Sequence, residues 1–215
     1  LGSEVLWGNY LLVIGLVSVI DNVIVTGTIQ GVSRFTAQDD ALAGAVKWAA
    51  LKVQLLLGGG MAAAYVAAAP LIARWERDPG LTHLYQLSAG IMFCYAFYAV
   101  FVGSLNGQRR FGRQASLDIG FATMRALAIL GAAALGWGVE GAVGGFVGAA
   151  AVILLISAGW VGLGGRGDPR FPARRIWSFM VQIFVYTLSL NLIMRVDLFL
   201  LKRLVGELAG AGDAL

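Results

Sequence analysis

Residues 7–32 read WGNYLLVIGLVSVIDNVIVTGTIQGV, a stretch that is mostly apolar and holds one charged side chain, Asp21. About 20 apolar residues are enough for an α-helix to cross the hydrocarbon core of a bilayer. A strand of a membrane β-barrel would instead alternate in polarity over about ten residues, and this stretch does not alternate. The sequence therefore predicts that these residues form a membrane-spanning helix.

Further stretches along the chain have the same character. They are Lys47–Ala73, Leu84–Leu105, Gln114–Leu135, Gly141–Leu163 and Ile176–Leu201. Each is long enough to span a bilayer, and none shows the alternation of a barrel strand. The pattern predicts an all-α fold, a polytopic transmembrane helix bundle of about six helices.

The composition agrees with a membrane protein. The 215 residues are 59% apolar and 13% charged, and their mean hydropathy is +0.78. Soluble domains are about 45–50% apolar and about 25% charged, so too few polar side chains remain to cover a surface in water. This excludes the soluble fold classes. The single cysteine, Cys94, also excludes a disulfide framework.

The arginines are unevenly distributed between the connections. The connections 33–46, 106–113 and 164–175 hold eight arginines, whereas the other side has four basic residues: Arg74, Arg77, Lys202 and Arg203. Cytoplasmic connections collect Arg and Lys, so the first set is predicted to face the cytoplasm. We expect a multi-pass protein of the cytoplasmic (inner) membrane. The same excess explains the net charge of +4, so no nucleic-acid partner is expected. The chain then begins outside the cell without a signal-like segment, and we expect an earlier helix to be missing.

Several charged side chains fall within or near the ends of the predicted spans. They are Asp21, Lys52, Asp118, Arg125, Arg195 and Asp197. A charge at the bilayer centre costs about 2.5–3.5 kcal/mol on insertion scales. In the first span a polar stripe recurs every four residues: Ser18, Asn22, Thr26, Gln30 and Arg34. The last span has a similar row: Thr187, Asn191 and Arg195.

Two interpretations of these polar residues remain open. The stripe in the first span either lines a water-filled cavity or forms hydrogen bonds between packed helices. Arg125 and Arg195 either face a substrate or pair with Asp118 and Asp197. Asp21 either binds a coupling ion or caps an arginine of a neighbouring helix. The fifth span differs, because its small residues predict close helix packing: Gly141, Gly144, Gly145, Gly148 and Ala149.

The usual signatures of catalysis and cofactor binding are absent from the sequence. His83 is the only histidine, so we expect no metal site built from familiar ligands. No Walker-type phosphate loop occurs, and no loop holds paired carboxylates or a Ser/His constellation. We therefore expect neither an enzyme nor a bound cofactor.

Two connections carry a family resemblance. Residues 105–115 read LNGQRRFGRQA, and residues 135–142 read LGWGVEGA. The first resembles the "L-x-G-x-x-R-F-x-x-x-A" connection, and the second the "L-G-x-G-V-x-G-A" turn, of the polysaccharide and lipid-linked oligosaccharide flippases. These belong to the multidrug/oligosaccharidyl-lipid/polysaccharide exporter superfamily. The opening Leu1-Gly2-Ser3-Glu4, with Gly8 and Tyr10, is similar to the residues that follow the family's first helix.

The resemblance implies an architecture larger than this chain. The family has two six-helix lobes around a central cationic cavity. Residues 1–201 would supply the first lobe without its first helix, as family helices two to seven, and residues 202–215 the truncated start of the second lobe. Arg34 then falls on helix two and Arg195 on helix seven, where cavity residues are expected.

The function implied is translocation of a polyprenyl-pyrophosphate-linked glycan by alternating access. The expected substrate contacts are Arg34, Arg125, Arg195, Asn22, Thr26, Gln30 and Asn191. Asp21 and Asp118 are the candidates for coupling to a proton or sodium gradient. The expected partners are membrane lipid and the polyprenyl-linked oligosaccharide, with the full-length protein monomeric. The alternatives are a polytopic enzyme of glycan assembly, such as a polymerase or ligase, and a multidrug exporter of the same superfamily. The outward connections, 74–83 and 136–140, are short for such an enzyme.

Overall fold

The computed structural model describes residues 2–163, 171–187, 189–190 and 193. These residues form helices α1 (Gly2–Gln38), α2 (Ala43–Trp75), α3 (Leu81–Gly107), α4 (Phe111–Ala134) and α5 (Gly138–Val161), with a short 3-10 helix, η1 (Asp40–Leu42), between α1 and α2. Residues 173–187 are also helical. The described part of the chain contains no strand, which confirms the all-α prediction. Asn191 and Arg195 lie outside the described residues.

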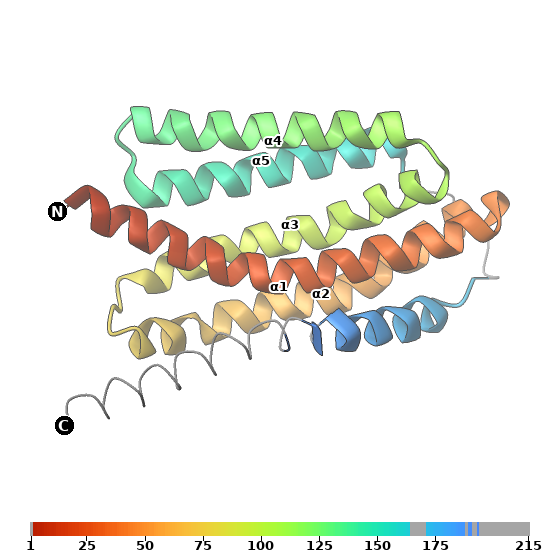
Figure 1. The fold of residues 1–215 in the computed structure, drawn as a ribbon, viewed down its shortest axis with the longest axis horizontal. Coiled ribbons are helices and arrows are strands. Elements are labelled where there is room, and N and C mark those ends of the chain that lie inside the picture. The colour runs from red at the N-terminus through yellow and green to blue at the C-terminus, as the bar shows by residue number, and fades with distance from the viewer. Residues whose placement is uncertain (1, 164–170, 188, 191–192, 194–215) are drawn as a thin grey trace, which may run out of the picture.

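The helices run alternately up and down through the bundle (Figure 1). The connections from α1 to α2 and from α3 to α4 lie at one end, which we call the arginine-rich end because it holds Arg34, Arg109, Arg110 and Arg113. Each of the five long helices is apolar enough to cross a membrane. Five of the predicted spans are thus confirmed, and the described part of the sixth is helical. The protein is a multi-pass membrane protein.

The boundaries differ most between the first two spans. The predicted connection 33–46 is largely helical, because α1 continues to Gln38 and α2 begins at Ala43. The turn itself is short: the Asp39 carboxylate accepts the backbone N–H of Ala41 at 2.9 Å and caps η1. Polar residues after Val32 end the apolar run without ending the helix, since a helix continues into water as readily as a loop does. Hydropathy therefore located the membrane segment and underestimated the helix.

Helix α3 is the centre of the bundle and packs against α1, α2 and α5. Glycines make the close approach possible. A Cβ on Gly103 would lie 2.9 Å from Val32 Cβ of α1, and one on Gly107 would lie 2.5 Å from Thr36 Cβ. On another side of α3, a Cβ on Gly90 would lie 2.8 Å from the Val147 side chain of α5. Small residues let helix backbones approach where lipid provides no hydrophobic drive for association.

Helix α4 packs mainly on α5 and makes no close contact with α1 or α2. The turn between α4 and α5 uses the glycines of the LGWGVEGA sequence. Gly136 and Gly138 have φ angles of 72° and 64°, a left-handed conformation that glycine adopts without steric cost. A Cβ on Gly145 would lie 3.0 Å from the Ala128 carbonyl oxygen of α4. Helices α4 and α5 form a hairpin (Figure 1), and a pocket lined by residues of α1 and α4 lies between this hairpin and α1.

Candidate functional site

The polar stripe of α1 lies on a face that the described helices leave open. Ser18, Asn22, Gln30 and Arg34 are exposed, and Thr26 is half-buried. The other face of α1 is buried in the bundle through Val13, Val17, Thr28 and Val32. Within the stripe, Thr26 Oγ1 donates a local hydrogen bond to Asn22 Oδ1 at 3.2 Å. Arg34, at the end of the stripe, contacts another helix, because its guanidinium carbon lies 4.8 Å from the Phe179 ring centroid. Both interpretations of the stripe therefore stay open.

A cleft of about 330 Å³ lies beside the first three residues of this stripe, Ser18, Asn22 and Thr26. It is bounded by α1, α3, α4 and α5. Its polar lining comes from Ser18, Asp21, Asn22, Thr26, Tyr95 and Arg125, and its apolar lining from Ile14, Val17, Val25, Ile91 and Phe146. The structure thus brings together four of the predicted site residues from two helices that are far apart in the sequence. Gln30, Arg34 and Asp118 do not line this cleft.

Arg125 is held in the cleft by aromatic rings. Its guanidinium carbon lies 5.2 Å from the centroid of the Phe146 ring and 5.8 Å from that of Phe121, and Tyr95 lines the same cleft. Such cation–π contacts position a guanidinium without neutralising its charge. Among the described residues no carboxylate lies within 4 Å of Arg125. No carboxylate of the described part of the chain therefore neutralises this charge.

Asp118 has partners other than Arg125. Its Oδ1 accepts a hydrogen bond from Tyr98 Oη at 2.7 Å, and its Oδ2 accepts one from Gln114 Nε2 at 3.4 Å. The expected alternative, a structural pair of Asp118 with Arg125, does not form. Asp118 instead ties α4 to α3, about two helical turns nearer the start of α4 than Arg125.

Asp21 is the buried carboxylate of the cleft. Its side chain is only 8% exposed, and within the described structure its Oδ1 has no hydrogen-bond partner. A buried carboxylate without partners is costly, and the cost falls when a proton or a cation neutralises the charge. No arginine within the described residues forms an ion pair with Asp21, and Arg195 lies outside them.

The sequence did not single out the aromatic residues of the site. Tyr95, Phe121 and Phe146 form a cluster of rings whose centroids lie 5.1–6.3 Å apart. Each lies within an apolar stretch of sequence. In such a stretch, the sequence does not distinguish an aromatic side chain that faces lipid from one that faces a cleft. The tyrosine hydroxyl was the only available signal, because a buried Tyr generally needs a polar partner.

Bundle and cleft together define a class: a multi-pass membrane protein with a partly polar interior face. The model of a family described as polysaccharide biosynthesis protein matches residues 12–210, and the chain belongs to this family. The match confirms the resemblance drawn from residues 105–115 and 135–142. No curated protein and no solved structure matches the chain. The protein is thus a membrane protein of glycan biosynthesis or export.

Proposed function

We propose that the protein translocates a polyprenyl-pyrophosphate-linked glycan across the cytoplasmic membrane by alternating access. The observation that carries the proposal is the position of Arg125 in a cleft along the polar face of α1. Within the described residues, Arg125 forms no ion pair. A polar face of this kind is incompatible with lipid tails, because each polar group would lose its hydrogen bonds to water. It suits a hydrated passage between two groups of helices, as in transporters that bind substrate near the bilayer midplane.

The cleft matches the chemistry of such a substrate. A guanidinium stays charged at all physiological pH values, and its planar N–H groups match phosphate oxygens. Ser18, Asn22 and Thr26 offer hydrogen-bonding groups for sugar hydroxyls beside it. Gln30 continues this polar face, and the family resemblance implies a substrate role for Asn191 and Arg195, which lie outside the described residues. The lipid tail would remain in the bilayer throughout.

An ion gradient is the proposed driving force. Asp21 is the better candidate for the coupling carboxylate, because it lines the cleft and its Oδ1 lacks a partner among the described residues. Asp118 is engaged by Tyr98 and Gln114 and is the weaker candidate. We propose a monomeric transporter that needs no bound cofactor.

The short connections favour transport over catalysis. At the end opposite the arginine-rich end, α2 and α3 are joined by residues 76–80, and α4 and α5 by residues 135–137. Neither is long enough to build a separate sugar-processing site. Within the described residues no three His, Cys, Asp or Glu side chains gather as potential metal ligands. The family description, which names polysaccharide biosynthesis, favours a glycan over a drug as the substrate.

The test is complementation of a flippase-deficient strain by the full-length protein. Arg125→Ala should abolish growth or polymer export, and Arg125→Lys should restore it only in part, because Lys lacks the planar fork. Arg74→Ala, an exposed arginine at the end of α2, is the matched control and should complement fully. Membrane levels of each variant are measured in parallel. Full complementation by Arg125→Ala at normal membrane levels of the protein would refute the role of Arg125 in substrate binding.

A further inference from the structure

A groove with one charged residue in its lining lies between α2, α3 and α5, and we call it the Lys52 groove. Its volume is about 500 Å³. Phe93, Phe97 and Phe101 line it from α3, four positions apart and therefore on one face of that helix. From α2 come Trp48 and Lys52, and the other lining residues are apolar. The groove shares no residue with the polar cleft described above.

The ammonium of Lys52 has no partner that neutralises it. Lys52 is exposed, and its Nζ lies 5.7 Å from the Trp48 ring centroid, a contact that positions a cation without cancelling its charge. Within the described residues it forms no ion pair. Lys47, on the same helix, is buried instead, and its Nζ donates a hydrogen bond to the Val161 carbonyl oxygen at 3.1 Å. One lysine of α2 is thus bound to the protein, whereas the other lines the groove with its charge unpaired.

The position of Lys52 along α2 corresponds to the edge of the membrane. Helix α2 has 33 residues and is therefore about 50 Å long at 1.5 Å per residue. Because the hydrocarbon core is about 30 Å thick, about 10 Å of a centred helix extends beyond it at each end. Lys52 follows Ala43, the first residue of α2, by about 14 Å along the axis. At this depth a lysine extends its ammonium to the headgroups while its stem stays in apolar surroundings, and tryptophan favours the same level.

The groove extends from this level into one leaflet. Helix α3 ends at Gly107, at the arginine-rich end, so Phe101 lies nearer to that end and Phe93 farther from it. The two positions are about 12 Å apart along the axis, close to the half-thickness of about 15 Å of the hydrocarbon core. Phe93 and Phe97 pack together with ring centroids 4.8 Å apart. The groove therefore offers an apolar wall from the headgroups to near the middle of the membrane.

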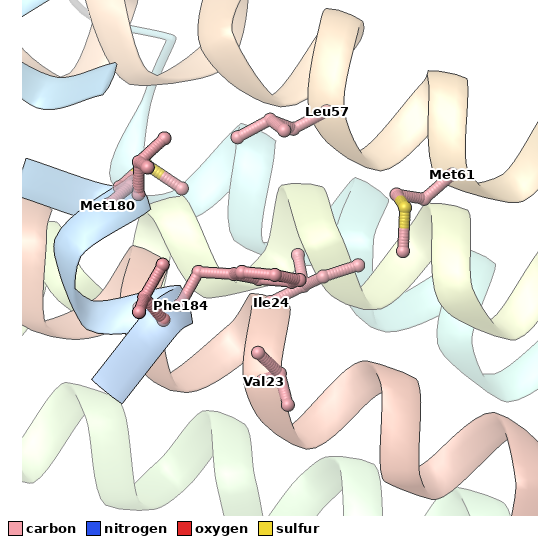
Figure 2. Close-up of a pocket in the computed structure, with 9 residues that line it drawn as sticks. Val23, Ile24, Leu57, Met61, Met180 and Phe184 are labelled. Carbon is pink, nitrogen blue, oxygen red and sulfur yellow. The ribbon is translucent and has the colours of Figure 1, made fainter. Parts of the chain in front are cut away.

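A second groove provides a reference without a cation. It has a volume of about 370 Å³ and lies between α1, α2 and the helical residues 173–187. Figure 2 shows Val23, Leu57 and Met180 among the side chains around it. None of the residues that line it is charged. This groove accepts hydrocarbon but has no side chain that selects a headgroup by its charge, unlike the groove at Lys52.

We propose that the Lys52 groove binds one anionic phospholipid of the leaflet at the arginine-rich end. Its phosphodiester contacts Lys52, and one acyl chain lies along the phenylalanines of α3. The single negative charge of phosphatidylglycerol complements a single ammonium, and basic pockets between membrane helices favour anionic headgroups. A zwitterionic headgroup brings a positive group as well, and no acidic residue lines the groove to receive it. The site is separate from the proposed transport cleft.

The experiment is photolabelling of the purified full-length protein in phosphatidylcholine nanodiscs. The probe is phosphatidylglycerol with a diazirine in one acyl chain, and mass spectrometry locates the adducts. They should map to Phe93 and Phe97. The same diazirine chain on phosphatidylcholine should label these residues about fivefold less, whereas both probes should label Leu57 and Met180 of the second groove alike. Equal labelling of the Lys52 groove by the two probes would show that it takes lipid regardless of charge and would overturn the proposal.

Variants of the cation test the headgroup contact. Lys52→Gln should abolish the preference for phosphatidylglycerol, and Lys52→Arg should keep it, because the charge is retained. Arg113→Gln is the matched control and should keep the preference. Arg113 lies at the same end and also stands over an aromatic ring, Trp160, at 5.9 Å, but it does not line the groove. A preference that persists in Lys52→Gln, or that Arg113→Gln lowers equally, would refute a specific role of Lys52.

Variants of the wall test the acyl-chain contact. Ala158, on α5, lines the groove, so Ala158→Phe should fill it and lower labelling by both probes. Gly159→Phe is the control, because a Cβ at Gly159 meets nothing within 4 Å, and it should leave labelling unchanged. If the wild-type groove gives no adducts, another segment of the chain or a second copy covers it, and the proposal fails. Complementation by Arg125→Ala bears on the polar cleft alone, so the two proposals fail independently.

Discussion

A single buried hydrogen bond joins α1 to α2. Gln54 Nε2 donates to Thr28 Oγ1, and Thr28 Oγ1 in turn donates to the Ile24 carbonyl at 2.7 Å. Both side chains are completely buried, and Gln54 Oε1 has no partner within the described structure. A buried polar group that loses its partner costs about 1–3 kcal/mol, whereas replacing both partners by apolar groups is often nearly neutral.

This asymmetry gives a prediction for the pair. Thr28→Val should lower the free energy of unfolding by about 1–3 kcal/mol, because the Gln54 amide is left without an acceptor. Adding Gln54→Met should recover most of that loss, since no buried polar group then remains at the contact. The measurement is thermal unfolding of the detergent-solubilised protein, with the single Gln54→Met variant completing the cycle. A double variant as unstable as Thr28→Val alone would contradict the argument.

The sequence identified part of the candidate site through the cost of charge in lipid. Asp21 and Arg125 stand out because each is expensive in a span, and the four-residue spacing picked out Asn22 and Thr26. Arg34 also stood out, but it does not line the cleft and lies over the Phe179 ring instead. The pairing partner of Asp118 was not predictable, because Tyr98 comes from another helix and its approach depends on how α3 and α4 pack.

At the scale of helices, the close contacts fall only in part on the glycines that the sequence favoured, among which Gly141 of α5 approaches Ala132 of α4. The glycine-rich row of α5 contributes through Gly145 against Ala128, whereas a Cβ on Gly148 would meet open space. The tightest contacts between α1 and α3 involve Gly103 and Gly107 instead. A row of glycines indicates that a helix is able to pack closely. Which glycine does so depends on the crossing point of the partner helix, and one sequence does not reveal it.

Gly107 provides the test of this packing. A Cβ at this position would lie 2.5 Å from Thr36 Cβ and 2.8 Å from the Ser33 carbonyl oxygen, so Gly107→Ala should force α1 and α3 apart. Overpacking of this kind costs about 1–3 kcal/mol. Gly120→Ala in α4 is the control, because a Cβ there meets nothing within 4 Å, and it should be neutral or slightly stabilising. Thermal unfolding and membrane yield report both effects. Equal stability of the two variants would contradict the close α1–α3 contact.

At the scale of the whole molecule, hydropathy predicted the number of spans far better than their arrangement. Helices in a membrane are apolar both toward lipid and toward each other, so the sequence does not say which face of a span meets a neighbour. The central position of α3 and the separation of α4 from α1 were therefore not predictable. That separation is what creates the cleft between Arg125 and Asp21.

The exposed surface of the bundle is of two kinds. Large apolar side chains cover one kind; Leu56 and Leu71 of α2, for example, are 73% and 71% exposed. The other kind is the polar face of α1, where Asn22 is also exposed. Side chains that are equally exposed in the bundle therefore meet different surroundings in a membrane. Lipid covers the apolar face, whereas water in the proposed passage covers the polar face.

Cysteine accessibility in intact membranes tests this difference. In a Cys94→Ala background, which removes the one native cysteine, single cysteines replace Asn22 or Thr26 on the polar face and Leu56 or Leu71 on the apolar one. A charged methanethiosulfonate reagent should modify the first two at least about tenfold faster, because the reactive thiolate forms in water and is disfavoured in apolar surroundings. All four should react alike after unfolding in detergent and denaturant, which controls for intrinsic reactivity. Slow modification of Asn22→Cys and Thr26→Cys in membranes would mean that this face of α1 is covered, and the hydrated passage would have to be abandoned.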